Sequence, residues 1–293
     1  MLSGINDGAF CKEATENEVK CTLSLAQGLP SVTKISQSLT AFTCNHVVPP
    51  SHIYMSCLSY GPTNLKLDFR HSTRTSDGMC DELGRVLLNC CSIIPAGVVV
   101  FLPSYSYEAH LVRRWKKTGI FDRIDKKKKI FREPKNSSDL ETCLLTYSRQ
   151  AISKNGSILL SVIGGKMSEG INFADNMARC VFVVGLPYPD IMCPEMKEKM
   201  SSLDRAFREK RSMISGQAYY HNLCMRAVNQ SIGRAIRHVN DYAAIILVDR
   251  RYANEQRIWN ALPFWLRKGE NKSTQASFGQ TILGLRDFFK TRI

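Results

Sequence analysis

Short apolar runs that alternate with amphipathic stretches are the feature that most constrains the fold of this chain. Five runs have the length and β-branched content of buried strands, and the segments between them are long enough to hold a crossover helix. Helices that connect parallel strands cover both faces of the sheet, which is the α/β class. The predicted strands are Ile53–Leu58, Gly97–Leu102, Ser157–Val162, Cys180–Val184 and Ala243–Val248.

Helical periodicity fills the gaps between these strands. A Ser-x-x-Glu pattern at Ser138 predicts a capping box at the start of one helix, and Gly119 is a typical C-terminal stop for another. The predicted helices cover 81–91, 107–117, 138–153, 194–210 and 218–239. We therefore expect one α/β domain at 41–268, a poorly ordered polar extension at 1–40 and a helical tail at 269–293.

The charge of the chain favours a polyanionic partner. Lys and Arg number 40 against 26 Asp and Glu, a formal net charge of +14, which points to nucleic acid before membrane. The longest nearly apolar run, 93–103, contains two prolines and is shorter than the roughly 20 residues of a spanning helix, so no membrane segment is predicted. The 11 cysteines include no C-x-x-C pair, which predicts reduced thiols and no metal site.

The segment 229–238, NQSIGRAIRH, is the most informative one for chemistry. On a helix, Gln230, Arg234 and Arg237 share one face, and their amide and guanidinium donors suit the oxygens of a phosphoryl group. The alternative is a solvated basic stripe in which Gly233 allows close helix packing. The opposite face is predicted to be core, with Ile232, Ala235, Ile236 and Val239.

A glycine-rich loop follows the predicted strand Ser157–Val162. Gly164, Gly165 and Gly170 allow backbone N–H groups to approach a ligand at the carboxyl end of a strand. The loop is not a Walker A motif, because Lys166 is followed by methionine and the G-x-x-x-x-G-K-[ST] spacing is absent. Alone, the pattern is weak support for ligand contact.

Together these segments resemble a known family. QSIGRAIR resembles motif VI of superfamily 2 helicases, GKMSEGINF resembles motif V and GVVVFLPSY resembles motif IV, in the order of the second RecA-like lobe of P-loop NTPase type. CNHVVPP, KKIFREPK, RRYA and LPFWLR are similar to the XPD-like iron–sulfur DNA helicases, in the Chl-type branch that acts in sister-chromatid cohesion. The resemblance covers about residues 41–290 and implies a RecA-like parallel sheet flanked by helices.

The resemblance implies roles for individual residues. Arg237 would be the arginine finger, with Arg234 and Gln230 at the nucleotide interface, because guanidinium groups stabilise charge on phosphoryl oxygens. XPD itself has Asp at the place of Asn172, whose amide can still donate and accept hydrogen bonds. The nucleotide-contacting set is Gly165, Glu169, Gly170, Asn172 and Gly233, and the DNA-contacting set from the same loop is Lys166 and Ser168.

The other half of such a motor is absent from the sequence. No P-loop occurs, and Asp81-Glu82 continues as Leu-Gly and cannot stand for a DEAH box. The resemblance implies that ATP and Mg²⁺ are shared with a first, N-terminal lobe that also carries the family's iron–sulfur cluster. We expect a nuclear C-terminal lobe, inactive alone, that acts with single-stranded or forked DNA and with cohesion and replication factors. The alternative is a truncated, non-catalytic product that binds DNA or a partner and competes with the full-length helicase.

A basic window supports DNA contact independently. Ten Lys and Arg residues lie between Arg113 and Arg132 against two acids, which predicts contact with a DNA backbone through Arg113, Arg114, Lys126 and Lys127. The alternative is a solvated face, in which 126–129 also resembles a weak nuclear-localisation patch. Tyr105 and Tyr107 could stack on a base, but core packing is favoured, and His238 is expected to form a structural hydrogen bond.

Overall fold

The computed structural model describes residues 48–171, 173–267, 271–273 and 277–292. The chain divides into two compact units, Val48–Ile191 with Tyr220–Ile293, and Met1–Val47 with Met192–Tyr219. The boundary between the two units falls within one helix, Gly216–Ile232. The predicted extension at 1–40 lies outside the described residues.

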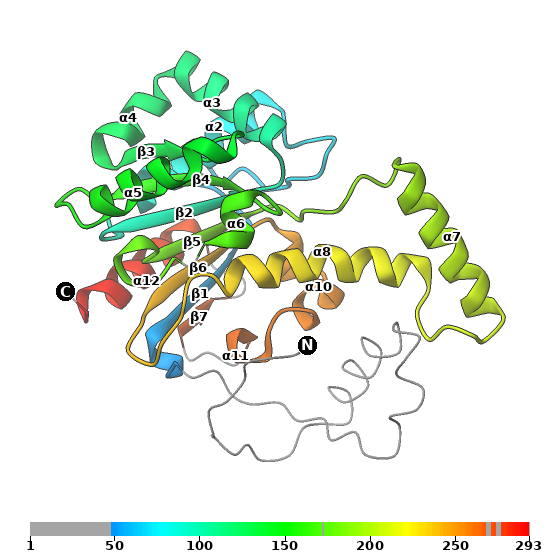
Figure 1. Cartoon of the computed structure of the whole chain (residues 1–293). Coiled ribbons are helices and arrows are strands. Elements are labelled where there is room, and N and C mark those ends of the chain that lie inside the picture. The colour runs from blue at the N-terminus through cyan, green and yellow to red at the C-terminus, as the bar shows by residue number, and fades with distance from the viewer. Residues whose placement is uncertain (1–47, 172, 268–270, 274–276, 293) are drawn as a thin grey trace. The chain divides into compact units, whose positions relative to one another are not determined.

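The larger unit is built on a parallel sheet of seven strands in its described part, in the order β3-β4-β2-β5-β6-β1-β7 (Figure 1). All five predicted strands are confirmed with the expected bounds. Two short edge strands were missed, because their few residues lie in polar surroundings and carry no apolar run. The strands are β1 (Ile53–Leu58), β2 (Gly97–Leu102), β3 (Lys129–Arg132), β4 (Ser157–Val162), β5 (Cys180–Val184), β6 (Ala243–Val248) and β7 (Asn271–Ser273).

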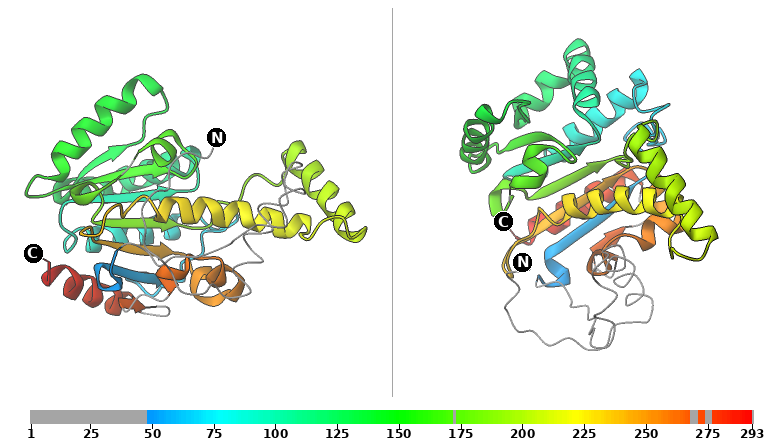
Figure 2. Two further views of the ribbon diagram at one scale, coloured as in Figure 1. Left: turned by 60° about the horizontal axis from the view of Figure 1, so that its bottom comes forward. Right: turned by 45° about the vertical axis from the view of Figure 1, so that its right-hand side comes forward.

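Helices cover both faces of this sheet (Figures 1 and 2). One face packs against α2 (Asp77–Cys90), α3 (Tyr105–Thr118), α4 (Ile120–Lys127) and α12 (Phe278–Lys290). The other packs against α5 (Leu140–Ala151), α6 (Lys166–Gly170), residues 220–232 of α8 (Gly216–Ile232), α10 (Gln256–Asn260) and α11 (Phe264–Arg267). The helix α9 (Arg251–Asn254) and the 3-10 turns Pro50–His52, Ser137–Asp139 and Asp175–Met177 (η4) complete the unit.

Successive residues of a central strand point into the two cores in turn. Val98, Val100 and Leu102 of β2 belong to the core under α2 and α3, whereas Val99 and Phe101 belong to the core under α8. Because both faces of the strand are buried, its sequence is continuously apolar and does not alternate. This explains why these strands could be located from the sequence alone.

Helix ends follow the expected chemistry at α3 but not at α5. The Ser104 hydroxyl accepts from the Tyr107 amide, and α3 ends at Gly119, whose φ of 72° is the left-handed region that glycine favours. The predicted capping box at Ser138 is wrong: Ser138 lies in the 3-10 turn, donates to the Asp139 carboxylate, and α5 begins at Leu140 with no side-chain cap.

The predicted helix 218–239 is wrong at its C-terminal end. Helix α8 ends at Ile232, and the amides of Arg234 and Ala235 bond to carbonyls three residues back, as in a tight turn. Ala235 and Ile236 are buried as expected, but Val239 is 53% exposed. Arg234 and Arg237 therefore lie on an irregular loop and do not share a helix face.

The smaller unit contains α7 (Pro194–Arg208), close to the predicted helix 194–210. Proline occupies the first turn of α7, where its missing N–H costs no helical hydrogen bond. The Asp204 carboxylate accepts from the Gly216 amide, and a Cβ on Gly216 would lie 2.5 Å from the Met200 carbonyl oxygen. In the described parts of both units, every helix is too short or too polar to cross a membrane.

Candidate functional site

The loop after β4 presents one predicted DNA contact and buries another. Gly164 has a φ of 73°, after which the chain enters the short helix α6. Lys166 is exposed and its ammonium donates to the Lys135 carbonyl, whereas Ser168 is 3% exposed and its hydroxyl donates to the Gly165 carbonyl. Of these two side chains, Lys166 is the one that the loop offers to a ligand.

A buried carboxylate that sequence reasoning missed holds this loop. Glu133 follows β3, is 8% exposed, and accepts four hydrogen bonds. Two of the four donors are backbone amides, which can only donate, so both carboxyl oxygens of Glu133 serve as acceptors. The donors are the Tyr105 hydroxyl (2.7 Å), the Ser161 hydroxyl (2.7 Å), the Val162 amide (2.9 Å) and the Met167 amide (3.1 Å). The available signal was an acid placed directly after a strand in KKIFREPK.

Gly165 is needed because Glu133 approaches it closely. A Cβ at Gly165 would lie 2.4 Å from Glu133 Oε1 and 2.9 Å from the Tyr105 hydroxyl. Gly170, by contrast, has open space around it. The predicted contact Asn172 lies outside the described residues, as does the side chain of Glu169.

The two predicted tyrosines have different environments. Tyr107 is 2% exposed, with the Arg74 guanidinium 5.3 Å from its ring centroid, so core packing is confirmed. Tyr105 is only half-buried, yet burial, followed by its bond to Glu133, raises its pKa to about 12. Tyr105 thus acts as a neutral donor that links the end of β2 to the carboxylate.

The loop before β6 carries the two predicted arginines close together. Arg234 Nη1 donates to the Ile171 carbonyl at 3.5 Å, which joins this loop to the segment after α6. The Arg237 side chain is exposed, and partial burial and then the positive charge of Arg234 lower its pKa. Gln230 is exposed in the last turn of α8, and a Cβ at Gly233 would meet nothing nearer than the Asn229 carbonyl at 3.4 Å. Close helix packing is therefore not the reason for Gly233.

A second missed carboxylate, Asp241, fixes the backbone of this loop. Its side chain is fully buried, and Oδ2 accepts from the Arg237 amide at 3.2 Å. Oδ1 accepts from Arg179 Nη1 and from the Tyr242 amide, both at 2.9 Å. Arg179 also stacks 4.0 Å from the centroid of the Tyr242 ring. The loop is thereby anchored to the residues that open β5 and β6.

His238 forms a structural contact, as expected. Its Nε2 lies 3.0 Å from Asp175 Oδ1 in η4. Asp175, His238 and Asp241 are the one group of three in the described chain whose ligand atoms lie close enough to hold a metal ion. Both oxygens of Asp241 already accept hydrogen bonds from the protein, so the donor set fits a structural network better than a metal site.

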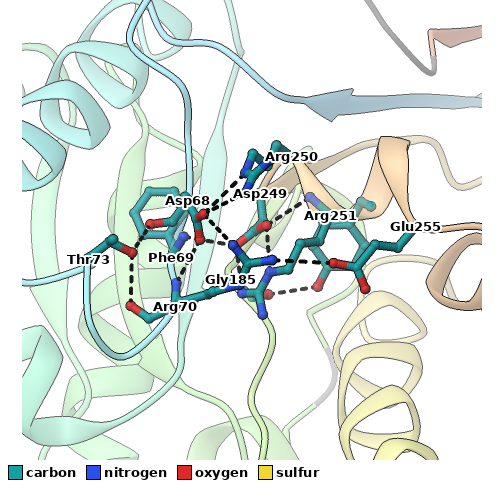
Figure 3. Close-up of polar contacts among 10 residues, drawn as sticks. Asp68, Phe69, Arg70, Thr73, Gly185, Asp249, Arg250, Arg251 and Glu255 are labelled. Atoms are coloured by element: carbon teal, nitrogen blue, oxygen red, sulfur yellow. Dashed lines mark hydrogen bonds and ion pairs between the residues drawn. The ribbon is translucent and has the colours of Figure 1, made fainter.

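A further network closes the carboxyl end of β6 (Figure 3). Asp249 is fully buried and accepts from the Phe69 amide at 3.0 Å and from both the amide and guanidinium of Arg251. Asp68 beside it pairs with Arg70 and Arg250; although burial opposes it, these hydrogen bonds hold the pKa of Asp68 below its usual value. The RRYA segment therefore serves packing in this part of the chain.

The basic window divides into internal pairs and exposed charges. Arg114 binds Asp81 through two bonds of 2.8 and 2.6 Å and also pairs with Asp77, so its charge is already balanced within the fold. The exposed cations are Arg113, Lys116, Lys117, Arg123, Lys126, Lys127, Lys129 and Arg132. Of these, Lys129 pairs with Asp125 and Arg132 pairs with Glu108. The solvated-face alternative thus holds for part of the window.

The predicted DNA contacts do not form one surface. Lys126 and Lys127 precede β3 and lie where the strands begin, whereas Lys166 follows β4 and lies where they end (Figure 1). Six residues of strand separate those edges, a span of roughly 16 to 20 Å.

Comparisons with known proteins identify relatives of the chain. Residues 87–269 match the family described as helicase C-terminal domain. The chain is 46% identical over 260 residues to the ATP-dependent DNA helicase DDX11 of Danio rerio, and 42% identical over 254 residues to the ATP-dependent DNA helicase chl1 of Schizosaccharomyces pombe. These matches cover 86% of this chain but only 29% and 30% of the two relatives, so the chain spans less than a third of their length.

Among solved structures, the chain is similar to one described as XPD_APO. The TM-score is 0.50 at 22% sequence identity, over 76% of this chain and 40% of that one. At this identity the likeness concerns the fold, and the parallel sheet flanked by helices agrees with a RecA-like lobe.

Proposed function

The chain belongs to the family of helicase C-terminal domains, as the C-terminal lobe of an XPD-like helicase of the Chl type, and from this premise we propose that it completes an ATP-dependent DNA motor. In this motor the chain would contact ATP through Arg234 and Arg237 and DNA through the loop after β4. We place that work in the nucleus, in DNA repair, replication and sister-chromatid cohesion, with the first lobe, DNA and cohesion and replication factors as partners.

The observation that carries the proposal is the pair Arg234 and Arg237. Both lie on the loop between α8 and β6, Arg237 is exposed, and Arg234 lies close enough for its charge to act on Arg237. Two neighbouring guanidinium groups suit the charged oxygens of a triphosphate. We assign Arg237 as the arginine finger and Arg234, Gln230 and Gly233 as further contacts to the nucleotide. Donors fixed in advance stabilise the charge that develops on the transferred phosphoryl group.

The remaining parts of the active site belong to the first lobe in this proposal. The exposed guanidinium of Arg237 fits a phosphate of ATP, whereas the acids near it are held by Arg179 and His238. Mg²⁺ and the iron–sulfur cluster of the family are therefore assigned to the first lobe. ATP supplies the free energy for lobe closure when bound, and this chain's residues bind and orient its phosphates.

The loop after β4 is the proposed link between nucleotide and DNA. Lys166 is its exposed cation, and the same loop reaches Arg234 through the Ile171 carbonyl. Glu169, Gly170 and Asn172 are assigned to this link by the resemblance of GKMSEGINF to motif V, with Gly165 required beside Glu133 and Ser168 closing the turn. DNA contact is proposed for Lys166 in this loop.

The test is ATP hydrolysis with single-stranded DNA, measured for this chain alone and after mixing with a separately produced first lobe of a relative. We expect no hydrolysis by the chain alone and hydrolysis on mixing. Substitution Arg237→Ala should abolish that gain, by about a hundredfold or more. The matched control is Arg226→Ala, an exposed arginine on the same helix as Gln230, which should change little.

Three outcomes would contradict the proposal. Hydrolysis by the chain alone would show a complete phosphate site within these residues. Equal losses for Arg237→Ala and Arg226→Ala would remove the special role of Arg237. A chain that binds DNA and never restores hydrolysis would instead support the competing, non-catalytic alternative.

A further inference from the structure

A basic hollow lies at the edge where β2, β3 and β4 begin. Its volume is about 420 Å³, and it is lined by the α2–β2 connection (91–95), the end of α4 with Lys126, Lys127 and Lys128, and Lys154 and Asn155 before β4. We call it the amino-edge hollow. None of its described lining residues is acidic. It lies at the opposite end of the strands from Lys166.

One cation of the hollow is built into the fold. Lys128 is 2% exposed, and its ammonium donates to the Ala96 carbonyl at 2.6 Å and the Asn155 carbonyl at 3.1 Å. These bonds tie the start of the edge strand β3 to the segments that precede β4 and β2, the next two strands of the sheet. Burial lowers the pKa of Lys128. The wall of the hollow thus holds a fixed amine whose position does not depend on a ligand.

Three further lysines surround this fixed group. Lys126 and Lys127 are exposed at the end of α4, and Lys154 is exposed on the α5–β4 connection. The Lys127 ammonium is steered by a bond of 2.7 Å to the Ser92 hydroxyl. Cations from two separate connections therefore converge on one hollow, which a single solvated helix face does not explain.

Helix dipoles do not balance this charge. Lys126 and Lys127 stand in the last turn of α4, where carbonyl groups attract cations. A helix end carries only roughly half an elementary charge, so the C-terminus of α4 offsets a small part of four lysines. The electrostatic potential of the hollow therefore remains positive, which favours the binding of an anion.

The surrounding surface extends the charge beyond the hollow. Arg123 is exposed one turn before Lys126, and Arg113, Lys116 and Lys117 are exposed on the second half of α3. Arg123 to Lys127 span about 6 Å along α4, so even these cations cover more than one phosphate spacing of a nucleic-acid strand. An extended polyanion matches this pattern better than a single small anion.

We propose that the amino-edge hollow and the exposed cations of α3 and α4 bind the phosphodiester backbone of DNA, as a contact surface separate from the loop that carries Lys166. Lysine supplies charge without base readout, so binding is sequence-independent and strongly salt-dependent. The inference does not require a role for Arg237 in hydrolysis, and it stands or falls by DNA binding alone.

The test compares charge reversals in the whole chain. The hollow variant carries Lys126→Glu, Lys127→Glu and Lys154→Glu, and a milder form replaces the same residues by Gln; Lys128 is left intact. The control variant carries Lys66→Glu, Lys197→Glu and Lys290→Glu, three exposed lysines elsewhere, so the change in net charge is equal. Binding to labelled single-stranded and duplex DNA of about 30 nucleotides is followed by fluorescence anisotropy across a salt series.

We expect the hollow variant to weaken DNA binding at least about tenfold and to lower the slope of log affinity against log salt by about 2 to 3. The Gln form should show a smaller loss in the same direction, and the control should stay within about threefold. Comparison of the two DNA forms identifies whether single strand or duplex is the preferred source of the phosphates. Thermal melting verifies that each variant is folded.

Equal losses in the hollow and control variants would overturn the proposal, because net charge would then explain the binding. Unchanged DNA binding in a folded hollow variant would also overturn it. A polyglutamate peptide serves as a second probe: if the hollow variant loses the peptide and keeps DNA, the surface binds an acidic protein segment and the DNA proposal is wrong.

Discussion

Tyr105 donates a hydrogen bond of 2.7 Å to Glu133, and this contact joins the end of β2 to the residue that follows β3. The same carboxylate also accepts a hydrogen bond from the backbone amide of Met167, the second residue of α6. The start of α3, the end of β4 and the start of α6 thus share the Glu133 carboxylate as a single acceptor, so the loop after β4 should depend strongly on Glu133.

Substitution Glu133→Gln should lower the free energy of unfolding by about 1 to 3 kcal/mol. The Gln side chain keeps one acceptor oxygen, but its NH₂ group faces an amide that also donates, so the Val162 or Met167 bond is lost. Urea unfolding measures the change. The control Glu141→Gln, at an exposed site on α5, should be nearly neutral, and an equal effect at both sites would contradict the role of Glu133.

Two glycines of the same loop should respond in opposite ways to alanine. Gly165→Ala places a Cβ 2.4 Å from Glu133 Oε1 and should cost about 1 to 3 kcal/mol of unfolding free energy. Gly170→Ala meets open space and should be neutral or stabilising by up to about 1 kcal/mol. Thermal melting of the pair gives the answer, and a larger loss at Gly170 would refute the crowding argument.

Substitution Asp241→Asn should destabilise the chain by about 3 kcal/mol, because it removes the charge that pairs with the nearly buried Arg179. It also weakens the acceptor of the Arg237 amide, whose hydrogen exchange should become faster. Denaturant unfolding and amide exchange measure the two effects. Asp122→Asn, an exposed change of the same kind, is the control; protection of the Arg237 amide that survives in Asp241→Asn would contradict the anchoring role.

Acid should destabilise the chain partly through Asp81. The hydrogen bonds from Arg114 hold the pKa of Asp81 below its usual 3.8, so the unfolded state binds a proton more readily. This contribution is fully present above pH 3.8 and is lost as the pH falls through the lower, folded value. Unfolding free energies between pH 2 and 6, roughly, should therefore fall less steeply in Asp81→Asn than in the parent chain. If the unfolding free energies of the parent chain and of Asp81→Asn fall with the same slope at low pH, the Asp81–Arg114 pair has no such effect.

The sequence predicted what depends on local pattern. The five central strands were located correctly because burial on both faces makes them continuously apolar. The end of α3 at Gly119 was predicted correctly because the chain there adopts a left-handed backbone conformation, which glycine favours. The helix through 239 failed because Ala235 and Ile236 keep a helical spacing of apolar residues while the backbone turns after Ile232. The spacing of apolar residues indicates which side chains are buried, but an irregular turn can bury the same side chains as a helix.

The sequence could not predict what depends on distant partners. Glu133 and Asp241 are single acids in charged surroundings, and their roles come from donors up to 62 residues away. The basic window had no local sign that Arg114 would meet Asp81, 33 residues earlier, while Lys126 and Lys127 would stay exposed. Such long-range pairs are set by the order of strands in the sheet, which the residue pattern alone left open.

The anchor between Asp241 and the Arg237 amide has a mechanical consequence. The Asp241 carboxylate that accepts from the Arg237 amide also binds Arg179 and the Tyr242 amide, directly before β5 and β6, while the Arg237 side chain is exposed. We therefore expect the backbone of Arg237 to move together with the segments that precede β5 and β6. A rotation of the sheet should then carry the Cα of Arg237 with it, so that the position of its side chain depends on the orientation of the whole sheet.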